Sequence, residues 1–344
     1  MIESTKRTVV PTQRKSPERS PVKIFGHRGC RGKEGIAENS LAAFEVALEN
    51  ADGIELDVFL TTNDQLVVFH DETLEKLTDG TGPITSHSLD QLKALRLREK
   101  PKSEIFTEDT IPTLDEVLKR VEEARAAHPD DQRLKDFKVC IEIKDPAITG
   151  KVRETINNHL GHGENDLSID NFEVRSFNMP SLVEMKKKMP EMQLGVLFAG
   201  PKYPWDTSEA LLKELLEANK GLFDESDKID KSGKRKPPNN TVSVTLNTLT
   251  DDALKAINET IGLDPKDGPR ITPWTAGEIN PDTLDTNQQK ALVATVEKAV
   301  GKGGAFITDF PEEMKKLMGK YRGTPEWGIR TGTGMAQGGG GIRA

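Results

Sequence analysis

The sequence predicts a TIM-type (β/α)8 barrel with a β-hairpin above the barrel mouth and flexible ends. Short apolar runs suited to strands recur along its 344 residues, most of them a helix-length interval apart. Several of these intervals open with a residue pattern that caps helices. Strands that alternate with amphipathic helices are typical of a parallel sheet, and a barrel of this kind commonly needs about 250 residues.

Nine apolar runs are strand candidates, one more than such a barrel uses. They are Val22–Gly26, Gly53–Val58, Leu66–Phe69, Lys138–Ile143, Phe172–Phe177, Gln193–Phe198, Val242–Leu246, Arg270–Trp274 and Ala305–Thr308. Only seven residues separate the second run from the third, whereas a crossover between parallel strands needs about a dozen. A turn at Thr62–Gln65 would fold these two runs into a hairpin, which leaves eight strands and brings Asp57 and His70 to nearly the same height.

The expected helices begin at recognisable caps. Capping boxes, in which Ser or Thr precedes Glu or Gln by three residues, occur at Ser88–Gln91, Thr113–Glu116 and Ser181–Glu184, and Pro281 follows a capping Asn280. Apolar residues share one helical face between positions 41 and 48 and again between 114 and 121. These helices are therefore expected to pack one face against the sheet.

A single domain is expected over residues 22–320. Residues 1–21 are polar and interrupted by prolines, which predicts a disordered leader. Residues 321–344, which end in a glycine-dominated stretch, predict a flexible tail. The lysine- and proline-rich stretch 224–240 is predicted to be a long surface loop.

Composition excludes several classes of protein. The chain carries 48 basic and 56 acidic side chains, a formal charge of −8, so nucleic acid is not an expected partner. No apolar run approaches the ~20 residues of a membrane span, and the first residues lack the apolar stretch of a secretory signal. With two cysteines, the chain can form at most one internal disulfide, so its fold is not expected to depend on disulfides. We expect a cytoplasmic protein without stable membrane insertion, and no pattern indicates its oligomeric state.

Ionisable and aromatic residues gather at the ends of the expected strands, where parallel barrels carry their chemistry. His27 and Arg28 follow the first run, Glu55 and Asp57 lie on the second, His70 follows the hairpin, Glu142 and Lys144 lie at the next barrel strand, and Trp274 and Asp309 end the last two. Alternation along a strand points Glu55 and Asp57 to the same side. We expect these side chains to share the barrel mouth.

Glu55, Asp57 and Glu142 would form a crowded acidic cluster. Such a cluster is unfavourable unless it is protonated or neutralised, and a hard divalent cation neutralises it well. Oxygen ligands alone favour Mg²⁺, Ca²⁺ or Mn²⁺ over zinc. The alternative is a set of ion pairs in the barrel core with cations such as Lys144 and Arg175, which is the commoner role for an isolated Glu-x-Asp pair.

His27 and His70 carry imidazoles with unperturbed pKa values of about 6.5, which suits them to general acid–base catalysis. Arg28 and Lys144 add positive charge. Together with a metal ion, these cations suit a phosphate group whose charge shifts during displacement. A nucleophilic role for Cys30 has little support, because no further histidine is reserved for it. The glycine clusters lack the spacing of nucleotide-binding motifs.

A series of short motifs runs in order along most of the chain, from about residue 22 to 318. They are Gly26-His27-Arg28-Gly29, Glu38-Asn39-Ser40, Glu55-Leu56-Asp57-Val58, Thr61-Thr62-Asn63-Asp64, His70-Asp71, Ile111-Pro112-Thr113-Leu114, Glu142-Ile143-Lys144, Ser176-Phe177-Asn178, Trp274-Thr275 and Ile307-Thr308-Asp309-Phe310-Pro311. Each motif is weak alone. The ordered set resembles the glycerophosphodiester phosphodiesterase (GDPD) family.

The resemblance implies a TIM-type barrel that hydrolyses a small glycerophosphodiester to glycerol 3-phosphate and an alcohol. It implies one divalent cation as cofactor, Mg²⁺ or Ca²⁺, with Mn²⁺ as a further candidate. By the same resemblance, Glu55, Asp57 and Glu142 would bind the metal, His27 and His70 would be the acid–base pair, Arg28 and Lys144 would hold phosphate oxygens, and Trp274 would pack against the glycerol moiety.

The mechanism that the resemblance implies has two stages. The glycerol 2-hydroxyl attacks phosphorus, and water then opens the cyclic phosphate. We take His70 as the base and His27 as the acid for the leaving group, although the sequence does not fix that order.

Three departures from the family pattern surround the expected site. The link Cys30–Ala37 is longer than usual, the tryptophan motif Pro273–Asn280 is extended, and the segment after His70-Asp71 is compact. All three lie where a leaving alcohol would be selected, so the preferred alcohol is left open. Two alternatives are a phospholipase of the same superfamily that acts on lysophospholipid or phosphatidylglycerol, and a non-catalytic barrel that binds phosphodiesters.

Overall fold

The computed structural model describes residues 22–161, 163, 166–198, 217, 220–222, 240–244, 257, 270–274, 279–300 and 304–321. The strands are β1 (Lys23–His27), β2 (Gly53–Leu60), β3 (Leu66–Val68), β4 (Lys138–Ile143), β5 (Phe172–Ser176), β6 (Gln193–Phe198), β7 (Thr241–Val244), β8 (Arg270–Ile271) and β9 (Ala305–Thr308). Each strand overlaps one of the nine apolar runs, so the existence of these strands is confirmed, with ends that differ by one or a few residues.

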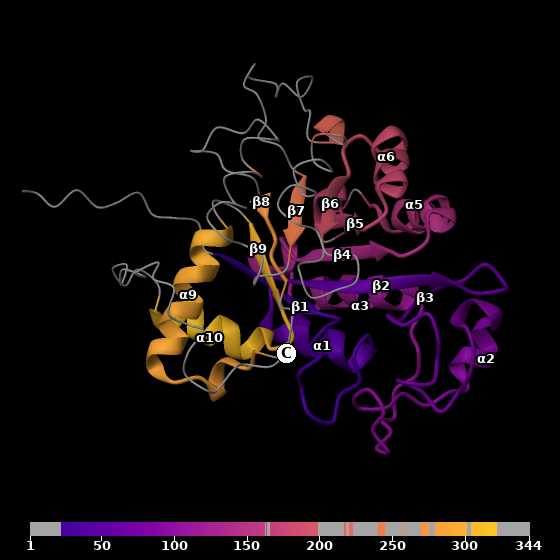
Figure 1. The fold of residues 1–344 in the computed structure, drawn as a ribbon. Coiled ribbons are helices and arrows are strands. Elements are labelled where there is room, and N and C mark those ends of the chain that lie inside the picture. Colours follow the sequence, from indigo (N-terminus) through magenta and orange to yellow (C-terminus); the bar gives the residue numbers. More distant parts are fainter. Residues whose placement is uncertain are drawn as a thin grey trace, which may run out of the picture.

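All the strands except β3 are parallel and follow one another around the sheet in chain order. Hydrogen-bonded neighbours run β8-β7-β6-β5-β4-β2-β1-β9. Just beyond β8, the Ile307 N–H donates to the Pro273 carbonyl at 3.0 Å, and a parallel bridge between Trp274 and Ile307 joins the two ends of this order. The curled sheet with helices between its strands confirms the predicted TIM-type barrel (Figure 1).

The predicted hairpin is also confirmed. Strand β3 pairs with β2 in the antiparallel sense, with Val58 opposite Val68. Beyond the paired residues, the Phe69 N–H donates to the Asp57 carbonyl at 3.0 Å. Because this bond holds the chain after β3 beside the end of β2, His70 returns to the level of Asp57, as the sequence predicted.

The helices alternate with the strands. They are α1 (Leu41–Asn50), α2 (Leu89–Lys93), α3 (Leu114–Ala127), α4 (Gln132–Lys135), α5 (Thr149–His159), α6 (Met179–Lys188), α9 (Thr286–Val300) and α10 (Pro311–Tyr321), with short 3-10 turns η1 (Ile84–Ser86), η2 (Pro146–Ile148), η3 (Ile169–Asn171), η4 (Lys220–Leu222) and η6 (Pro281–Thr283). In Figure 1, α9 and α10 lie beside β1 and β9, whereas α5 and α6 lie on the side of β5 and β6.

Two of the three predicted capping boxes are confirmed. Ser88 caps α2 and Thr113 caps α3, each with the reciprocal side-chain bond. The box predicted at Ser181 is wrong, because α6 begins at Met179 with Pro180 in its first turn. Proline is tolerated there because the N–H it lacks would have no helical partner. Ser181 therefore lies inside the helix instead of capping it.

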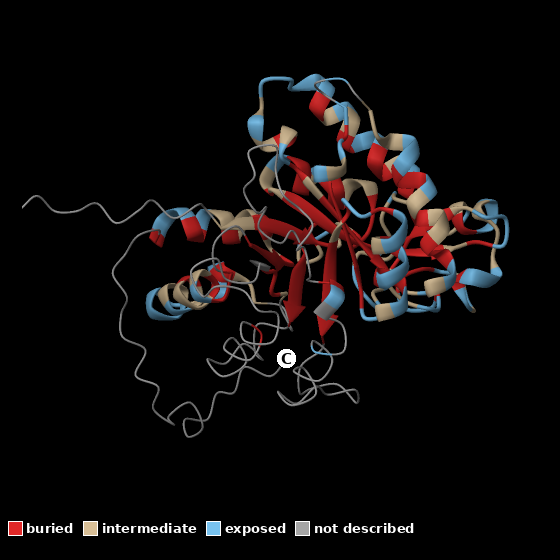
Figure 2. Cartoon of the chain, turned by 90° about the horizontal axis from the view of Figure 1, so that it is seen from above, coloured by how far each residue is buried: buried red, intermediate tan, exposed pale blue. Residues whose placement is uncertain are grey.

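Buried residues concentrate on the strands, while the helices turn exposed residues outward (Figure 2). In α1, Phe44, Ala47 and Leu48 of the predicted apolar face are buried together with Ala43, whereas Leu41 is only partly buried. Complete burial of a side chain such as Phe44 contributes about 2–3 kcal/mol to folding. A separate core that includes Phe69, Leu74 and Ile84 lies under the segment after β3 and supports the position of His70.

Several sequence predictions fall outside the described residues. They are the leader 1–21, most of the loop 224–240 and nearly all of the tail 321–344. The domain limits at 22 and 320 remain predictions. Among the described helices, none combines the length and the apolar character needed to cross a bilayer.

Candidate active site

Strand β1 delivers His27 to the barrel mouth and then turns sharply. Arg28 and Gly29 have positive φ angles of 50° and 85°. A Cβ atom on Gly26 would lie 1.7 Å from the Gly29 carbonyl oxygen, so only glycine fits there. The turn directs the Arg28 N–H toward Glu55 Oε2, at 3.3 Å. The Gly-His-Arg-Gly motif therefore has a structural reason for both of its glycines.

The three predicted metal ligands lie together. Glu55 and Asp57 lie on the same face of β2, and Glu142 lies opposite Asp57 on β4. One oxygen atom from each side chain lies within 4.8 Å of the other two. All three residues are buried, with exposed fractions of 5%, 1% and 7%. The structure thus brings together the acidic cluster that the sequence predicted.

Lys144 neutralises part of this cluster. Its Nζ lies 2.8 Å from Asp57 Oδ1 and 2.6 Å from Glu142 Oε1. Burial would raise the pKa of Asp57, but Lys144, His70 and Arg28 hold it well below its usual range. Arg175, by contrast, is paired with Glu173, which lies two residues earlier on β5. The alternative interpretation, ion pairs in the barrel core, therefore holds for the contacts that Asp57 and Glu142 make with Lys144, but not for a pair with Arg175.

Lys144 forms its ion pairs with Asp57 and Glu142 and not with Glu55, so the Glu55 carboxyl is the least neutralised of the three. Burial, followed by the repulsion of Asp57, raises the pKa of Glu55 to about 7. A carboxyl group in this state is stabilised by a further cation. Hard divalent ions bind clusters of oxygen donors, and such an ion would stabilise the charged form of Glu55. The three residues are therefore suited to the predicted cofactor.

His27 is held by a carboxylate from the other end of the chain. Its Nδ1 donates to Asp309 Oδ1 at 2.5 Å. Burial opposes ionisation of Asp309, but His27 lowers its pKa, so the group accepts as a carboxylate. His27 Nε2 then faces the acidic cluster, 3.9 Å from Glu55 Oε2.

His70 has the same kind of partner. Its Nδ1 donates to Asp71 Oδ1 at 2.7 Å, and Lys76 contacts the other oxygen of Asp71 at 3.2 Å. The hydrogen bond from His70 lowers the pKa of Asp71 to about 2. The His70 side chain is 31% exposed and that of His27 is 10% exposed. Both imidazoles are therefore oriented at Nδ1, which leaves Nε2 as the atom available to a substrate.

Among the described residues, Arg28 and Trp274 each present a donor without a hydrogen-bond partner. The Arg28 guanidinium donates to Glu38 at 2.6 Å, while its buried Nε forms no hydrogen bond within the described part of the chain and lies 3.6 Å from Asp57. Trp274, just beyond β8, is half-buried, and its Nε1 forms no hydrogen bond with any described residue. Such orphaned donors are expected where a ligand supplies the acceptor.

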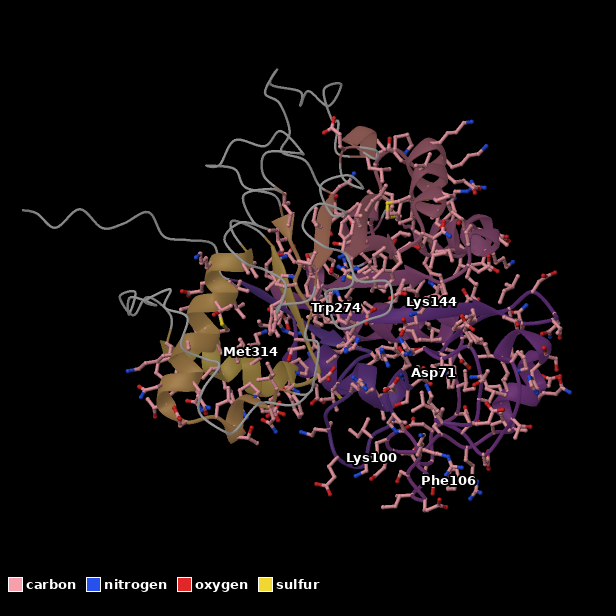
Figure 3. All side chains as sticks on the ribbon, in the orientation of Figure 1. Asp71, Lys100, Phe106, Lys144, Trp274 and Met314 are labelled. Atoms are coloured by element: carbon pink, nitrogen blue, oxygen red, sulfur yellow. The ribbon has the colours of Figure 1, made fainter. Side chains whose placement is uncertain are left out.

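A cavity of about 230 Å³ opens beside the cluster. Glu142, Lys144, Ser176, Phe177 and Asn178 contribute to its lining. Figure 3 places Lys144, Asp71 and Trp274 around the strand ends, whereas Phe106 and Lys100 lie well away from them. Four residues of the tryptophan motif, 275–278, lie outside the described residues.

Sequence reasoning assigned no role to the residues that hold the site in place. Asn39 Nδ2 donates to Asp57 at 3.1 Å, Glu38 holds Arg28, and Asp309 holds His27. The sequence placed Asp309 at the barrel mouth, just after the last expected strand, but it did not indicate that Asp309 would hold His27. Glu38 and Asn39 belong to the Glu38-Asn39-Ser40 motif of the resemblance, but the motif by itself does not identify Arg28 and Asp57 as their partners.

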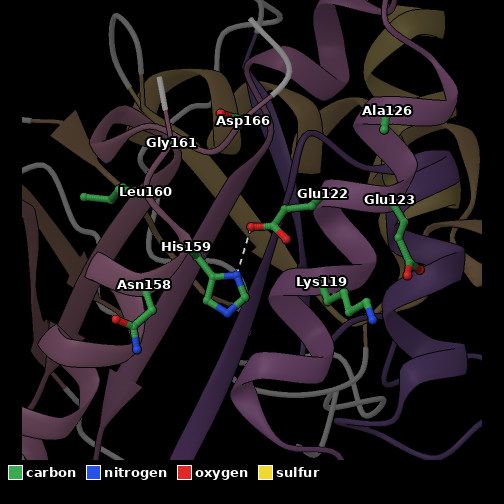
Figure 4. Close-up of a pocket in the computed structure, with 9 residues that line it drawn as sticks. All are labelled: Lys119, Glu122, Glu123, Ala126, Asn158, His159, Leu160, Gly161 and Asp166. Atoms are coloured by element: carbon green, nitrogen blue, oxygen red, sulfur yellow. Dashed lines mark hydrogen bonds and ion pairs between the residues drawn. The ribbon is translucent and has the colours of Figure 1, made fainter. Parts of the chain in front are cut away.

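A larger cavity, of about 450 Å³, lies between α3 and α5. Figure 4 shows His159 directed at Glu122, and its two ring nitrogens lie 2.9 Å from Glu122 and from Asp115. None of the residues lining it belongs to the predicted site. The smaller cavity at the strand ends is therefore the candidate active site.

The fold and the site together define the class of protein to which the chain belongs. Two imidazoles oriented by carboxylates, buried acids and two cations at the mouth of a parallel barrel are typical of barrel hydrolases that act on a phosphate ester.

The family follows from comparison with known proteins. The model of the glycerophosphoryl diester phosphodiesterase family matches residues 27–276, so this chain belongs to that family. Membership confirms the predicted resemblance and the predicted enzyme class, a phosphoric diester hydrolase.

Individual relatives agree with this assignment. A glycerophosphodiester phosphodiesterase of Caldanaerobacter subterraneus is 37% identical over 193 residues, 53% of this chain and 69% of the relative. One from Bacillus altitudinis is 37% identical over 185 residues, 51% of this chain and 66% of the relative. The matches span about two thirds of the length of these relatives.

A solved structure resembles the fold at lower identity. It is an Oleispira antarctica phosphodiesterase in complex with its product sn-glycerol-3-phosphate, with a TM-score of 0.56 and 19% identity, covering 87% of this chain and 97% of that one. At this identity the likeness concerns the fold alone.

Proposed function

We propose that this chain hydrolyses small glycerophosphodiesters to glycerol 3-phosphate and an alcohol, through a divalent cation and two histidines. The observation that carries the proposal is the pair of imidazoles, His27 and His70, each oriented by a carboxylate beside one acidic cluster. The relatives are named for this activity, and glycerol 3-phosphate is the product bound to the Oleispira enzyme.

Glu55, Asp57 and Glu142 would hold the cation. Their all-oxygen donor set and the raised pKa of Glu55 support a hard ion, Mg²⁺ or Ca²⁺, with Mn²⁺ as a further candidate. When bound, the ion would neutralise phosphate charge and polarise the attacking hydroxyl.

The histidines would move the protons. His70 Nε2, on the more exposed side of the site, would accept the proton of the glycerol 2-hydroxyl as it attacks phosphorus. His27 Nε2 would donate a proton to the departing alcohol, while Asp309 holds its Nδ1–H. In the second stage the roles reverse, and a water molecule opens the cyclic phosphate.

The cations and the tryptophan would position the substrate. The unpartnered Nε of Arg28 and the ammonium of Lys144 would donate to phosphate oxygens. The Trp274 ring would pack against the glycerol moiety, with its unpartnered Nε1 available to a hydroxyl. These donors lie just beyond the ends of β1, β4 and β8, so they would approach the phosphate from different strands.

The test is release of glycerol 3-phosphate from glycerophosphocholine and glycerophosphoethanolamine by the chelator-treated chain, with Mg²⁺, Ca²⁺ or Mn²⁺ restored. We expect turnover only with added metal and its loss in His27→Ala and in His70→Ala. Full turnover after metal removal would exclude the metal mechanism. Cleavage of lysophosphatidylcholine or phosphatidylglycerol alone would favour the phospholipase alternative, and saturable binding without hydrolysis would favour the non-catalytic barrel.

A further inference from the structure

Arg31 joins two buried carboxylates at the edge of the site. Its Nε donates to Glu38 Oε2 at 2.9 Å, and its Nη1 donates to Asp309 Oδ2 at 3.4 Å. The Arg31 side chain is 27% exposed, whereas those of Glu38 and Asp309 are 3% and 1% exposed. Arg31 therefore reaches from the surface to two groups that water does not reach.

Each of these carboxylates uses its other oxygen to hold a residue of the proposed machinery. Asp309 Oδ1 accepts from His27 at 2.5 Å, and Glu38 Oε1 accepts from Arg28 at 2.6 Å. A carboxylate bound at one oxygen can still rotate, whereas bonds to both oxygens fix its plane. Arg31 supplies the second bond in both cases.

The backbone places Arg31 independently of these ion pairs. The Gly32 N–H donates to the Asp309 carbonyl at 2.9 Å. A Cβ atom on Gly32 would lie 2.4 Å from the Phe310 ring, so the loop lies directly on the chain after β9. Lys33 then contacts Glu312 of α10 at 3.2 Å, in an exposed pair.

The charges support the same arrangement. Burial would raise the pKa values of Glu38 and Asp309. Arg28 together with Arg31 lowers that of Glu38, and His27 together with Arg31 lowers that of Asp309, so both stay ionised. An ionised Asp309 can only accept at Oδ1, which keeps the ring proton of neutral His27 on Nδ1.

We propose that Arg31 is a positioning residue, which fixes Asp309 and Glu38 and through them orients His27 and Arg28. The assignment rests on the proposed function. Arg31 lies in the link Cys30–Ala37, between the first two motifs of the resemblance.

The first test compares Arg31→Ala and Arg31→Lys with Lys33→Ala, which removes the neighbouring exposed pair. Misplacement of a catalytic group commonly costs about 10- to 100-fold in kcat. We expect such a loss in Arg31→Ala, an intermediate loss in Arg31→Lys because an ammonium lacks the planar fork, and wild-type kcat in Lys33→Ala. The Kd of the metal should stay unchanged in all three.

The second test does not depend on activity. The ring-nitrogen NMR signals of His27, assigned with His27→Gln, should report the Nδ1–H tautomer in the wild-type chain and a mixture of tautomers in Arg31→Ala at the same pH. If Arg31→Ala unfolds, Arg31→Gln and Arg31→Lys carry the comparison.

The outcomes separate the two proposals. If the wild-type chain hydrolyses no phosphodiester, the proposed function fails, while the NMR comparison still tests Arg31. If the wild-type chain is active but kcat and the His27 tautomer are unchanged in the Arg31 variants, the positioning role is overturned. An equal loss in Lys33→Ala would also overturn it, because the effect would then belong to the loop as a whole.

Discussion

The three carboxyl groups of the acidic cluster are neutralised to different extents by their neighbours. Asp57 and Glu142 both contact the Lys144 ammonium, whereas Glu55 faces His27 at 3.9 Å. Because Glu55 is buried and repelled by Asp57, its pKa is raised to about 7. Glu55 is thus the proposed ligand whose proton would compete with a metal ion.

Metal affinity should therefore depend on pH. The ion binds the ionised carboxylate, so below a pKa of about 7 it must displace a proton from Glu55. We expect the Kd to weaken by about tenfold per pH unit below about 7 and to level off above it. Calorimetric titration of the chelator-treated chain across this range measures the slope. Glu55→Gln should bind more weakly and lose the dependence, and a flat profile in the wild-type chain would contradict the assignment.

The carboxylate behind His27 should matter as much as the imidazole. Asp309→Asn replaces an acceptor with a group that can donate, so His27 Nδ1 loses its fixed proton. We expect kcat to fall by about 10²- to 10⁴-fold with a smaller change in KM. Glu312→Gln, which alters an exposed acid on α10, is the control and should keep wild-type kcat. Comparable activity in Asp309→Asn would show that the pair does not orient His27.

Cys30 directly follows the Gly26-His27-Arg28-Gly29 motif but should be chemically inert. Burial raises the pKa of its thiol to about 12, and the residue is 2% exposed. A thiolate is the reactive form, so iodoacetamide at about pH 8 should leave Cys30 unmodified in the native chain and alkylate it in urea. Mass spectrometry of both samples decides this. Rapid native labelling, or loss of turnover in Cys30→Ala, would contradict this expectation.

At the level of elements, periodicity predicted the framework well and the supporting contacts poorly. Alternation within β2 was enough to place Glu55 and Asp57 on one face, and the short interval before Leu66 was enough to predict the hairpin. The bond from Arg31 to Asp309 joins residues 278 positions apart. Local patterns report which face a residue occupies, and they carry no information on such partners.

The cap of α3 offers a test of an element that the sequence did predict. Thr113 Oγ1 accepts from the Glu116 N–H at 3.1 Å, and Glu116 returns a bond to the Thr113 N–H at 2.7 Å. Thr113→Ala should lower the free energy of unfolding by about 1 kcal/mol, and Thr113→Ser should recover most of it. Urea denaturation measures both. Equal stability of Thr113→Ala and wild type would show that the cap is not used.

The whole molecule assembles its site from both ends of the chain. His27 and Asp309 are 282 residues apart in sequence, and they meet because β1 pairs with β9. Closing the barrel also brings three carboxylates within 4.8 Å of one another. Folding therefore concentrates negative charge, and a bound cation should favour the folded state.

Stability should consequently follow metal concentration. A ligand that binds only the folded chain stabilises it by about 2.7 kcal/mol at a hundred times its Kd, so Ca²⁺ or Mg²⁺ should raise Tm by several degrees. Scanning calorimetry with and without chelator measures this shift. Glu55→Gln removes both the repulsion and a proposed ligand, so its metal-free Tm should exceed that of the metal-free wild-type chain, and added metal should change it little. If added metal leaves the Tm of the wild-type chain unchanged, the cluster is neutralised by Lys144 and Arg28 alone.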